Sequence, residues 1–208
     1  MSDVAKTARY AAIYALGVFL NRAVSFIMLP IYTRFLTPKD YGTIELLTMT
    51  VDVFGMIASV GLTAAVFRFY YKYEEQEKRN QVISTISILL TLFYFMAGTL
   101  GLSMSNVFAG MILDGTTESV LYFRLIFITF FLQAFVEIPL IFIMAQQRPI
   151  FYVSVSTGKL LLQLSLNIIF VVHLEMGVLG VLYSGLSSAL ITGIVLSSYT
   201  YIMVGFSF

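Results

Sequence analysis

The sequence predicts an all-α membrane protein with six transmembrane helices, and three observations lead to this fold class. The chain of 208 residues is 59% hydrophobic and only 11% charged, whereas about 25% of the residues in soluble domains are charged. Six apolar runs each approach the roughly 20 helical residues that are needed to cross a bilayer core. Polar residues inside these runs recur on single helix faces, as expected where lipid cannot satisfy them.

The six predicted spans form a single lobe over residues 1–208. They lie near 10–36, 42–67, 81–103, 118–144, 151–172 and 179–203. The apolar run that follows Lys6 and Arg9 is longer than the core of a signal peptide, so we expect the first helix to remain in the protein.

Basic residues predict how this lobe is oriented. The loops on one side hold seven of them, and the loops on the other side hold only Lys39. The seven are Lys6, Arg9, Arg68, Lys72, Lys78, Arg79 and Arg148. Because cytoplasmic loops are enriched in Lys and Arg, we expect both termini in the cytoplasm.

The loop 68–80 is the one strongly charged segment. Glu74/Lys78 and Glu75/Arg79 stand at i,i+4, which favours a short surface helix. The segment is either a solvated loop with tyrosines at the interface or a docking site for another protein.

The composition excludes several functions. The chain has no cysteine and a single histidine, which rules out disulfides, thiolate sites and multi-histidine metal sites. A net charge of +1 gives no reason to expect nucleic acid as a partner. No P-loop, GxSxG or HExxH motif is present. We therefore expect no catalytic residues, no cofactor and no metal.

Arg22 is the first candidate site residue. It lies about halfway along an apolar run, where an arginine costs about 2.5–3.5 kcal/mol on insertion scales and normally faces protein or water. Its guanidinium could hold a phosphate by two hydrogen bonds, or it could pair with Asp52 or Glu45 of the next helix. Asp52, the deeper acid, could carry a coupling ion or neutralise the arginine, and Glu45 could lie at the interface.

Further candidates lie in the spans 118–144 and 151–172. Arg124 either extends to the outer interface or faces a cavity. Glu137, one turn from Gln133 and just before a proline that could bend the helix, has either a cavity role or a structural role. Lys159 could extend to the cytoplasmic interface, but its stripe with Gln163 favours the cavity.

Polar stripes on three spans predict a shared polar interior, because lipid cannot satisfy them. The stripes are Glu45, Thr48, Asp52, Ser59 and Thr63; Ser84, Ser87, Thr91, Tyr94 and Gly98; and Tyr152, Ser156, Lys159, Gln163 and Asn167. The last span instead repeats small residues at every fourth position, which is typical of close helix packing. These residues are Gly180, Ser184, Ser188 and Thr192.

Two motifs resemble a known family. The segment LPIYTRFLTPKDYG at 29–42 resembles the first hairpin of polysaccharide and O-antigen flippases, which belong to the multidrug/oligosaccharidyl-lipid/polysaccharide exporter superfamily. The segment AAVFRFYYKYEEQEKRNQVIST at 64–85 is similar to that family's exit from the second helix into a charged loop, and AQQRP at 145–149 fits the order of spans.

The resemblance implies a transporter of the cytoplasmic membrane that flips undecaprenyl-diphosphate-linked oligosaccharides by alternating access between two six-helix lobes. By position, Arg22 would belong to the cavity, with Lys159 and Arg124 as weaker candidates and Asp52 or Glu137 as possible ion-coupling sites. Family members carry two such lobes, so we expect a second lobe from a missing carboxy-terminal half or from a homodimer, and we favour a fragment. The alternatives are a cation-coupled multidrug exporter and a non-transporting remnant or assembly partner.

Overall fold

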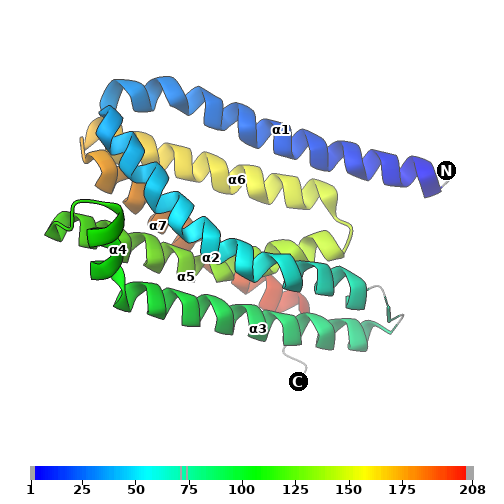
Figure 1. Ribbon diagram of the computed structural model, residues 1–208. Helices are drawn as coiled ribbons and strands as arrows, with labels where there is room; N and C mark the ends of the chain where they lie inside the picture. The colour runs from blue at the N-terminus through cyan, green and yellow to red at the C-terminus, as the bar shows by residue number, and fades with distance from the viewer. Residues whose placement is uncertain (1–2, 71, 74, 205–208) are drawn as a thin grey trace.

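The computed structural model describes residues 3–70, 72–73 and 75–204, and this part of the chain is helical apart from its turns (Figure 1). Its elements are α1 (Asp3–Phe35), α2 (Pro38–Tyr70), α3 (Gln76–Ser103), α4 (Ser105–Ile112), α5 (Thr117–Ala145), α6 (Pro149–Asn167), the π-helix η1 (Ile168–His173) and α7 (Gly177–Val204). Among the described residues, four helices are long and apolar enough to cross a membrane: α3, α5, α6 continued by η1, and α7. That α1 and α2 also cross it stays a prediction.

Two elements differ from the sequence-based expectation. The segment 104–117, predicted to be a loop, contains the helix α4, whose Ala109 is fully buried against α5. The buried Ser105 begins this helix, and its hydroxyl donates to the carbonyl of Gly101 over 3.0 Å. The span near 151–172 also changes to π-helical geometry after Asn167. Neither feature has the length or periodicity of a spanning helix, so the apolar runs alone did not reveal them.

The turn between α1 and α2 is closed by a capping box. The Thr37 amide and hydroxyl both donate to Asp40 Oδ2, at 2.9 and 2.7 Å, and the Asp40 amide donates to Thr37 Oγ1 over 3.2 Å. Pro38 occupies the first helical position, where its missing N–H costs nothing. The Thr37-Pro38-Lys39-Asp40 sequence thus ends one helix and starts the next within a few residues.

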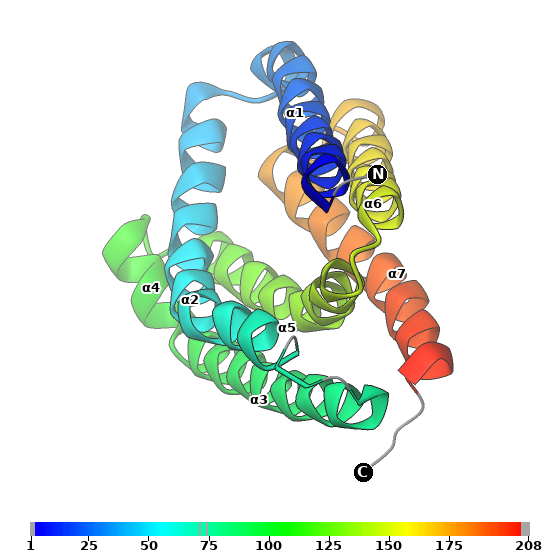
Figure 2. The same ribbon diagram turned by 90° about the vertical axis from the view of Figure 1, so that its right-hand side faces the viewer.

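Helix α5 is the centre of the bundle. It packs against α2, α3, α4, α6 and α7, and it is the most buried of the four apolar helices. Figure 2, which looks along the helices, shows α1 beside α6 on one side and α3 beside α5 on the other. The buried clusters join α5 to α2, α3, α4 and α7, and none of them contains a described residue of α1.

Pro139 lies inside α5 without interrupting it. A proline at this position cannot donate to the carbonyl of Phe135, four residues earlier. Ser197 of α7 supplies the missing donor, since its hydroxyl lies 3.4 Å from that carbonyl. The carbonyl that Pro139 leaves without its helical donor is therefore satisfied by a neighbouring helix, as membrane helices require.

The connections of the bundle lie at two opposite ends (Figure 1). One end holds both termini, the α2–α3 connection and the α5–α6 connection, and the other holds the α1–α2 turn, α4 and the η1–α7 turn. The first group carries the basic residues counted in the sequence, so we call it the basic end. Its cytoplasmic location stays a prediction.

Candidate functional site

Glu137 is the centre of a polar cluster inside the bundle. Its half-buried side chain accepts a hydrogen bond of 3.1 Å from Gln133 Nε2, one turn earlier on α5. It also lies close enough to interact electrostatically with Lys159 and Tyr152 of α6 and with Tyr94 of α3. Glu137 and Lys159, which the sequence offered as separate candidates, thus lie near each other, although they form no ion pair among the described residues.

The polar stripe of α6 faces α7. Asn167 is 2% exposed, and its Oδ1 accepts a 2.5 Å hydrogen bond from the fully buried hydroxyl of Ser184. Gln163 is half-buried, and its Nε2 lies 4.0 Å from the position that a Cβ on Gly185 would occupy. The absence of a side chain on Gly185 leaves room for this amide beside α7. Lys159 and Gln163 therefore line the same face of α6, turned into the bundle.

The small residues of α7 form the matching surface. Gly180, Ser184, Ser188 and Thr192 are all buried, as expected for close packing. A Cβ added to Gly180 would lie 3.0 Å from the carbonyl carbon and oxygen of Phe170. Gly177, in contrast, has φ +56°, a turn conformation that suits glycine.

The candidates on α1 and α2 remain apart from this cluster. Arg22, Glu45 and Asp52 are exposed. None of them takes part in an ion pair among the described residues, so the predicted pairing of Arg22 with either acid is not formed in this structure. The side chains of Ser59 and Thr63, predicted to share the polar face of α2, lie outside the described part of the chain.

Arg124 is also distant from Glu137. It is exposed near the start of α5, thirteen residues before Glu137, which corresponds to about 20 Å along a helix. The structure does not gather Arg124 with Lys159.

The charged segment at the basic end is arranged differently from the prediction. The ion pair there joins Lys78 Nζ to Glu75 Oε1 at 3.0 Å, with i,i+3 rather than i,i+4 spacing. Arg79 Nε instead donates to the carbonyl of Tyr73 over 2.7 Å, and its guanidinium lies 5.3 Å from the ring centre of Tyr70. The segment from Gln76 onward begins α3 rather than forming a separate helix, and Glu74 lies outside the described residues.

A polar contact at the other end joins two connections. Lys39 Nζ, next to the α1–α2 turn, lies 3.8 Å from Asp114 Oδ2 between α4 and α5. The hydroxyls of Ser119 and Thr116 also donate to Asp114. These hydrogen bonds, with that of Ser119 strongest, lower the pKa of Asp114 from 3.8 to about 2, and Lys39 adds a smaller effect.

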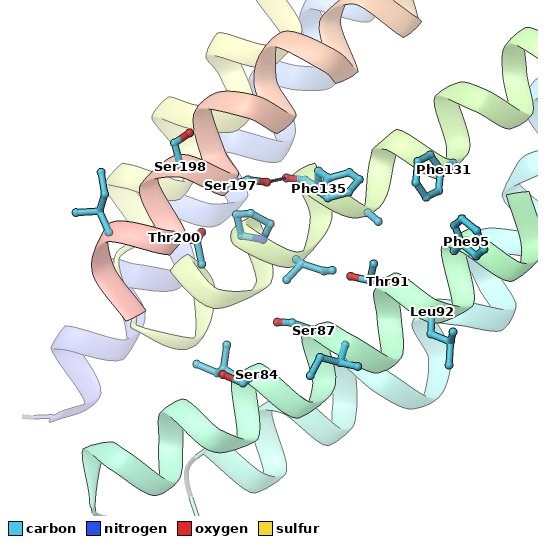
Figure 3. A pocket seen from close by; sticks show the side chains of 16 residues that line it. Ser84, Ser87, Thr91, Leu92, Phe95, Phe131, Phe135, Ser197, Ser198 and Thr200 are labelled. Carbon is cyan, nitrogen blue, oxygen red and sulfur yellow. Dashed lines mark hydrogen bonds between the residues drawn. The ribbon is translucent and has the colours of Figure 1, made fainter. Parts of the chain in front are cut away.

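A large groove lies between α3 and α7, with α5 as its floor (Figure 3). It has a volume of about 920 Å³ and is lined within residues 83–95 of α3, 131–139 of α5 and 197–202 of α7. Hydroxyl side chains lie on both walls, and most of the remaining surface is apolar; the hydroxyls are those of Ser84, Ser87 and Thr91 on α3 and of Ser197, Ser198 and Thr200 on α7. We call it the α3–α7 groove. The sequence had placed the α3 hydroxyls in a shared polar interior, whereas they open into an apolar groove away from Lys159.

Among the described residues, no three His, Asp or Glu side chains are grouped so that they could hold a metal ion. The site therefore consists of an acid, a cation, amides and tyrosines within a bundle of long apolar helices. The four long apolar helices indicate a multi-pass membrane protein.

A sequence model of the family described as polysaccharide biosynthesis protein matches residues 8–208, nearly the whole chain. The chain therefore belongs to this family of polysaccharide flippases, as its two motifs predicted. No curated protein and no solved structure is significantly similar to the chain.

Proposed function

We propose that this chain is one lobe of a flippase that moves a lipid-linked oligosaccharide, carried on undecaprenyl diphosphate, across the cytoplasmic membrane for surface polysaccharide synthesis. Its membership of the polysaccharide biosynthesis family over residues 8–208 carries this proposal. The asymmetry of basic residues supports an orientation with the basic end in the cytoplasm.

The chemistry of the substrate suggests a role for each candidate side chain. A diphosphate needs cations and hydrogen-bond donors, which Lys159 and Gln163 offer on one face of α6. Arg22 on α1, which is exposed, adds a planar guanidinium suited to phosphate oxygens. Glu137 lies close to Lys159 and would neutralise the positive charge of Lys159 until the diphosphate binds. Arg124 would contact the substrate near the opposite end.

A second six-helix lobe is the partner that this function requires. Arg22, Glu45 and Asp52 are exposed on α1 and α2, and at membrane depth such side chains must face protein or water rather than lipid. A second lobe across this face, from another part of a longer chain or from a second copy, would enclose them in a water-filled cavity. Alternating access would then be a rocking motion of one lobe against the other.

A cation-coupled exporter is the second candidate, because Glu137 is half-buried and interacts with Lys159. A carboxylate in such a position can bind a proton or a sodium ion in place of its interaction with the lysine. Drug efflux that follows expression, without any change in surface polysaccharide, would favour this function over the flippase.

The flippase is tested by complementation of a cell in which the gene is deleted. We expect Lys159→Ala and Arg22→Ala to reduce surface polysaccharide at least tenfold while the proteins still insert, and Lys159→Arg to retain export. The matched control is Arg34→Ala, since Arg34 lies in the last turn of α1, beside the capped turn. Polysaccharide is measured on the cell surface, and protein in the membrane fraction by immunoblot. Normal export by both alanine variants at equal protein levels would refute the cavity assignment.

A further inference from the structure

The π-helix η1 joins the polar stripe of α6 to the turn before α7. The Leu174 amide there donates to the carbonyl of Ile169, five residues earlier, over 3.0 Å. A π-helix closes hydrogen bonds between residues five apart, rather than four apart as in an α-helix, so each of its turns takes about one residue more. One extra residue rotates the preceding helix by about 100° relative to a continuous α-helix. The geometry of η1 therefore sets the direction in which the α6 side chains point.

Helix α6 has an exposed face and a face turned into the bundle. The exposed residues recur at every third or fourth position and are Ser154, Gly158, Leu161 and Ser165. The polar stripe with Lys159 and Gln163 is offset from them by two positions, which is about 200° around a helix, and it is half-buried. A rotation of about 100° would move Lys159 and Gln163 from the inner face to the side of α6.

Helix α7 holds η1 at short range. A Cβ added to Gly180 of α7 would lie 3.0 Å from the carbonyl carbon and oxygen of Phe170, and Val171 is buried. The backbones of α7 and η1 therefore approach as closely as a glycine allows. Helix α7 is thus the surface against which the rotation of α6 is fixed.

Asn167 fixes the end of α6 that adjoins η1. Its side chain is hydrogen-bonded to Ser184 of α7, and both side chains are buried. A rotation of α6 would leave these buried polar groups without partners, which is costly. About two turns along α6, the hydroxyl of Ser188 lies 3.5 Å from the carbonyl of Lys159. Asn167 and Lys159 are therefore held against α7 in one register.

We propose that Asn167 and η1 position the transport site by fixing the rotation of α6, so that the Lys159 ammonium and the Gln163 amide face the diphosphate. Asn167 acts through Lys159 and does not touch the substrate. The consequence for transport rests on the proposed flippase function. The rotation of α6, in contrast, can be measured without transport.

Distances between spin labels on the purified protein test the rotation. The chain has no cysteine, so labels attach only to introduced ones. Leu161→Cys with Ile194→Cys places labels at exposed positions of α6 and α7, and the control pair Leu92→Cys with Ile194→Cys joins α3 to α7. The extra residue is removed by deleting Ile169, which is 47% exposed.

We expect the deletion to change the α6–α7 label distance and to leave the control distance unchanged. A side chain that ends about 5–6 Å from the helix axis moves by about 8 Å when the helix rotates by about 100°. Paramagnetic resonance resolves such a shift. If the deletion variant does not fold, as judged by circular dichroism, Asn167→Ala carries the same label pairs, and we expect a broader α6–α7 distance distribution there.

Export of surface polysaccharide tests the role of Asn167. We expect Asn167→Ala to reduce export about tenfold at unchanged protein level, because a misplaced binding group loses much of its effect. Combined with Lys159→Ala it should be no worse than Lys159→Ala alone, since both changes act through one cation. Ser184→Ala, which removes the other partner, should behave in the same way. The matched control is Ser165→Ala, which should export normally, since that exposed hydroxyl donates within α6 to the Leu161 carbonyl.

The outcomes separate the two roles. An unchanged α6–α7 distance would overturn the role of η1. Normal export by Asn167→Ala, or a further loss in the double variant with Lys159→Ala, would overturn the role of Asn167, because a residue needed only for folding adds its effect to others. Normal export by Lys159→Ala would refute the flippase site itself, and the label distances would still decide whether η1 fixes α6.

Discussion

The two sides of this bundle are built in different ways. Helices α3, α4, α5 and α7 pack closely together: Phe123 and Phe127 of α5 are fully buried, and Phe108 of α4 stacks on Phe123. Helix α1 packs mainly on α6, which is the least buried of the four apolar helices. The first region is stable through its own packing, whereas the second carries the exposed Arg22 and depends on further partners.

This contrast separates stability from function. Apart from Arg124 near the start of α5, the polar candidates lie on α1, on α2, or where α6 meets the packed region, as with Lys159 and Glu137. The residues that hold the packed region together are apolar or small. Substitutions in the packed region should therefore affect folding, and substitutions in the other region should affect transport.

The largest expected effect is that of Gly101→Ala in the packed region. A Cβ there would lie 2.2–2.6 Å from three ring atoms of Phe127, which is fully buried and cannot move aside. We expect a loss of about 3 kcal/mol in the free energy of unfolding, at the upper end of overpacking effects. Unfolding in detergent, followed by circular dichroism, measures it. The matched control is Gly158→Ala on α6, where a Cβ meets nothing within 4 Å; equal losses would contradict this view of the packed region.

The second effect concerns the boundary between the regions. Removing one partner of Glu137 and Lys159 leaves the other charge inside the bundle, so Glu137→Gln and Lys159→Met should each destabilise the protein. The double variant should be less destabilised than the sum of the two, with a coupling energy of about 1 kcal/mol. A double-mutant cycle on unfolding free energies measures it. Additive effects would show that the two charges do not interact.

A smaller effect is expected from Gly17→Ala, which makes the same change at the contact of α1 with α6. A Cβ there would lie 2.7 Å from Val153 Cγ2, a half-buried side chain at the edge of the bundle. We expect about 1 kcal/mol of destabilisation, because α1 can shift with little loss of packing. The same unfolding assay compares it with Gly101→Ala. A loss as large as that at Gly101 would mean that both contacts are equally rigid.

The smallest expected effect is the contribution of Asp114 to the pH dependence of protein stability. Asp114 lies between α4 and α5, at the end of the bundle opposite the basic end. Its pKa is lowered to about 2 by hydrogen bonds from Ser119 and Thr116. A carboxylate with a lowered pKa stabilises the folded state above its unfolded pKa, and this contribution disappears as the pH falls from about 4 towards 2. The difference in melting temperature between wild type and Asp114→Asn should be constant from pH 7 to 5 and shrink below pH 4. A difference that persists unchanged at pH 2 would contradict the assignment.

Much of the fold follows from local patterns in the sequence. The apolar runs correspond to long helices because each run satisfies its own backbone hydrogen bonds in a helix, whatever its neighbours. The close packing of the small residues of α7 was also predicted, since such contacts depend on residue type at fixed spacing. The short helix α4 was missed because eight residues are too few for a clear period.

The candidate site was only partly predictable, for a reason that the stripes illustrate. Polar residues on one helix face must avoid lipid, but the pattern does not say which helix they will meet. The stripe of α6 meets α7 and Glu137, whereas the hydroxyls of Ser84, Ser87 and Thr91 open into the α3–α7 groove. Periodicity shows which face of a helix is polar, and tertiary packing determines which neighbouring helix that face contacts.

The sequence by itself determined that this chain is an all-helical protein of the polysaccharide biosynthesis family, because hydrophobic period, turn chemistry and motifs are properties of neighbouring residues. Tertiary structure alone decided that Lys159 lies close to Glu137, that Ser197 satisfies the carbonyl freed by Pro139, and that a groove opens between α3 and α7 beside α5. Each of these joins residues that are 22 to more than 100 positions apart. Such contacts arise from how whole helices pack, which no local pattern encodes.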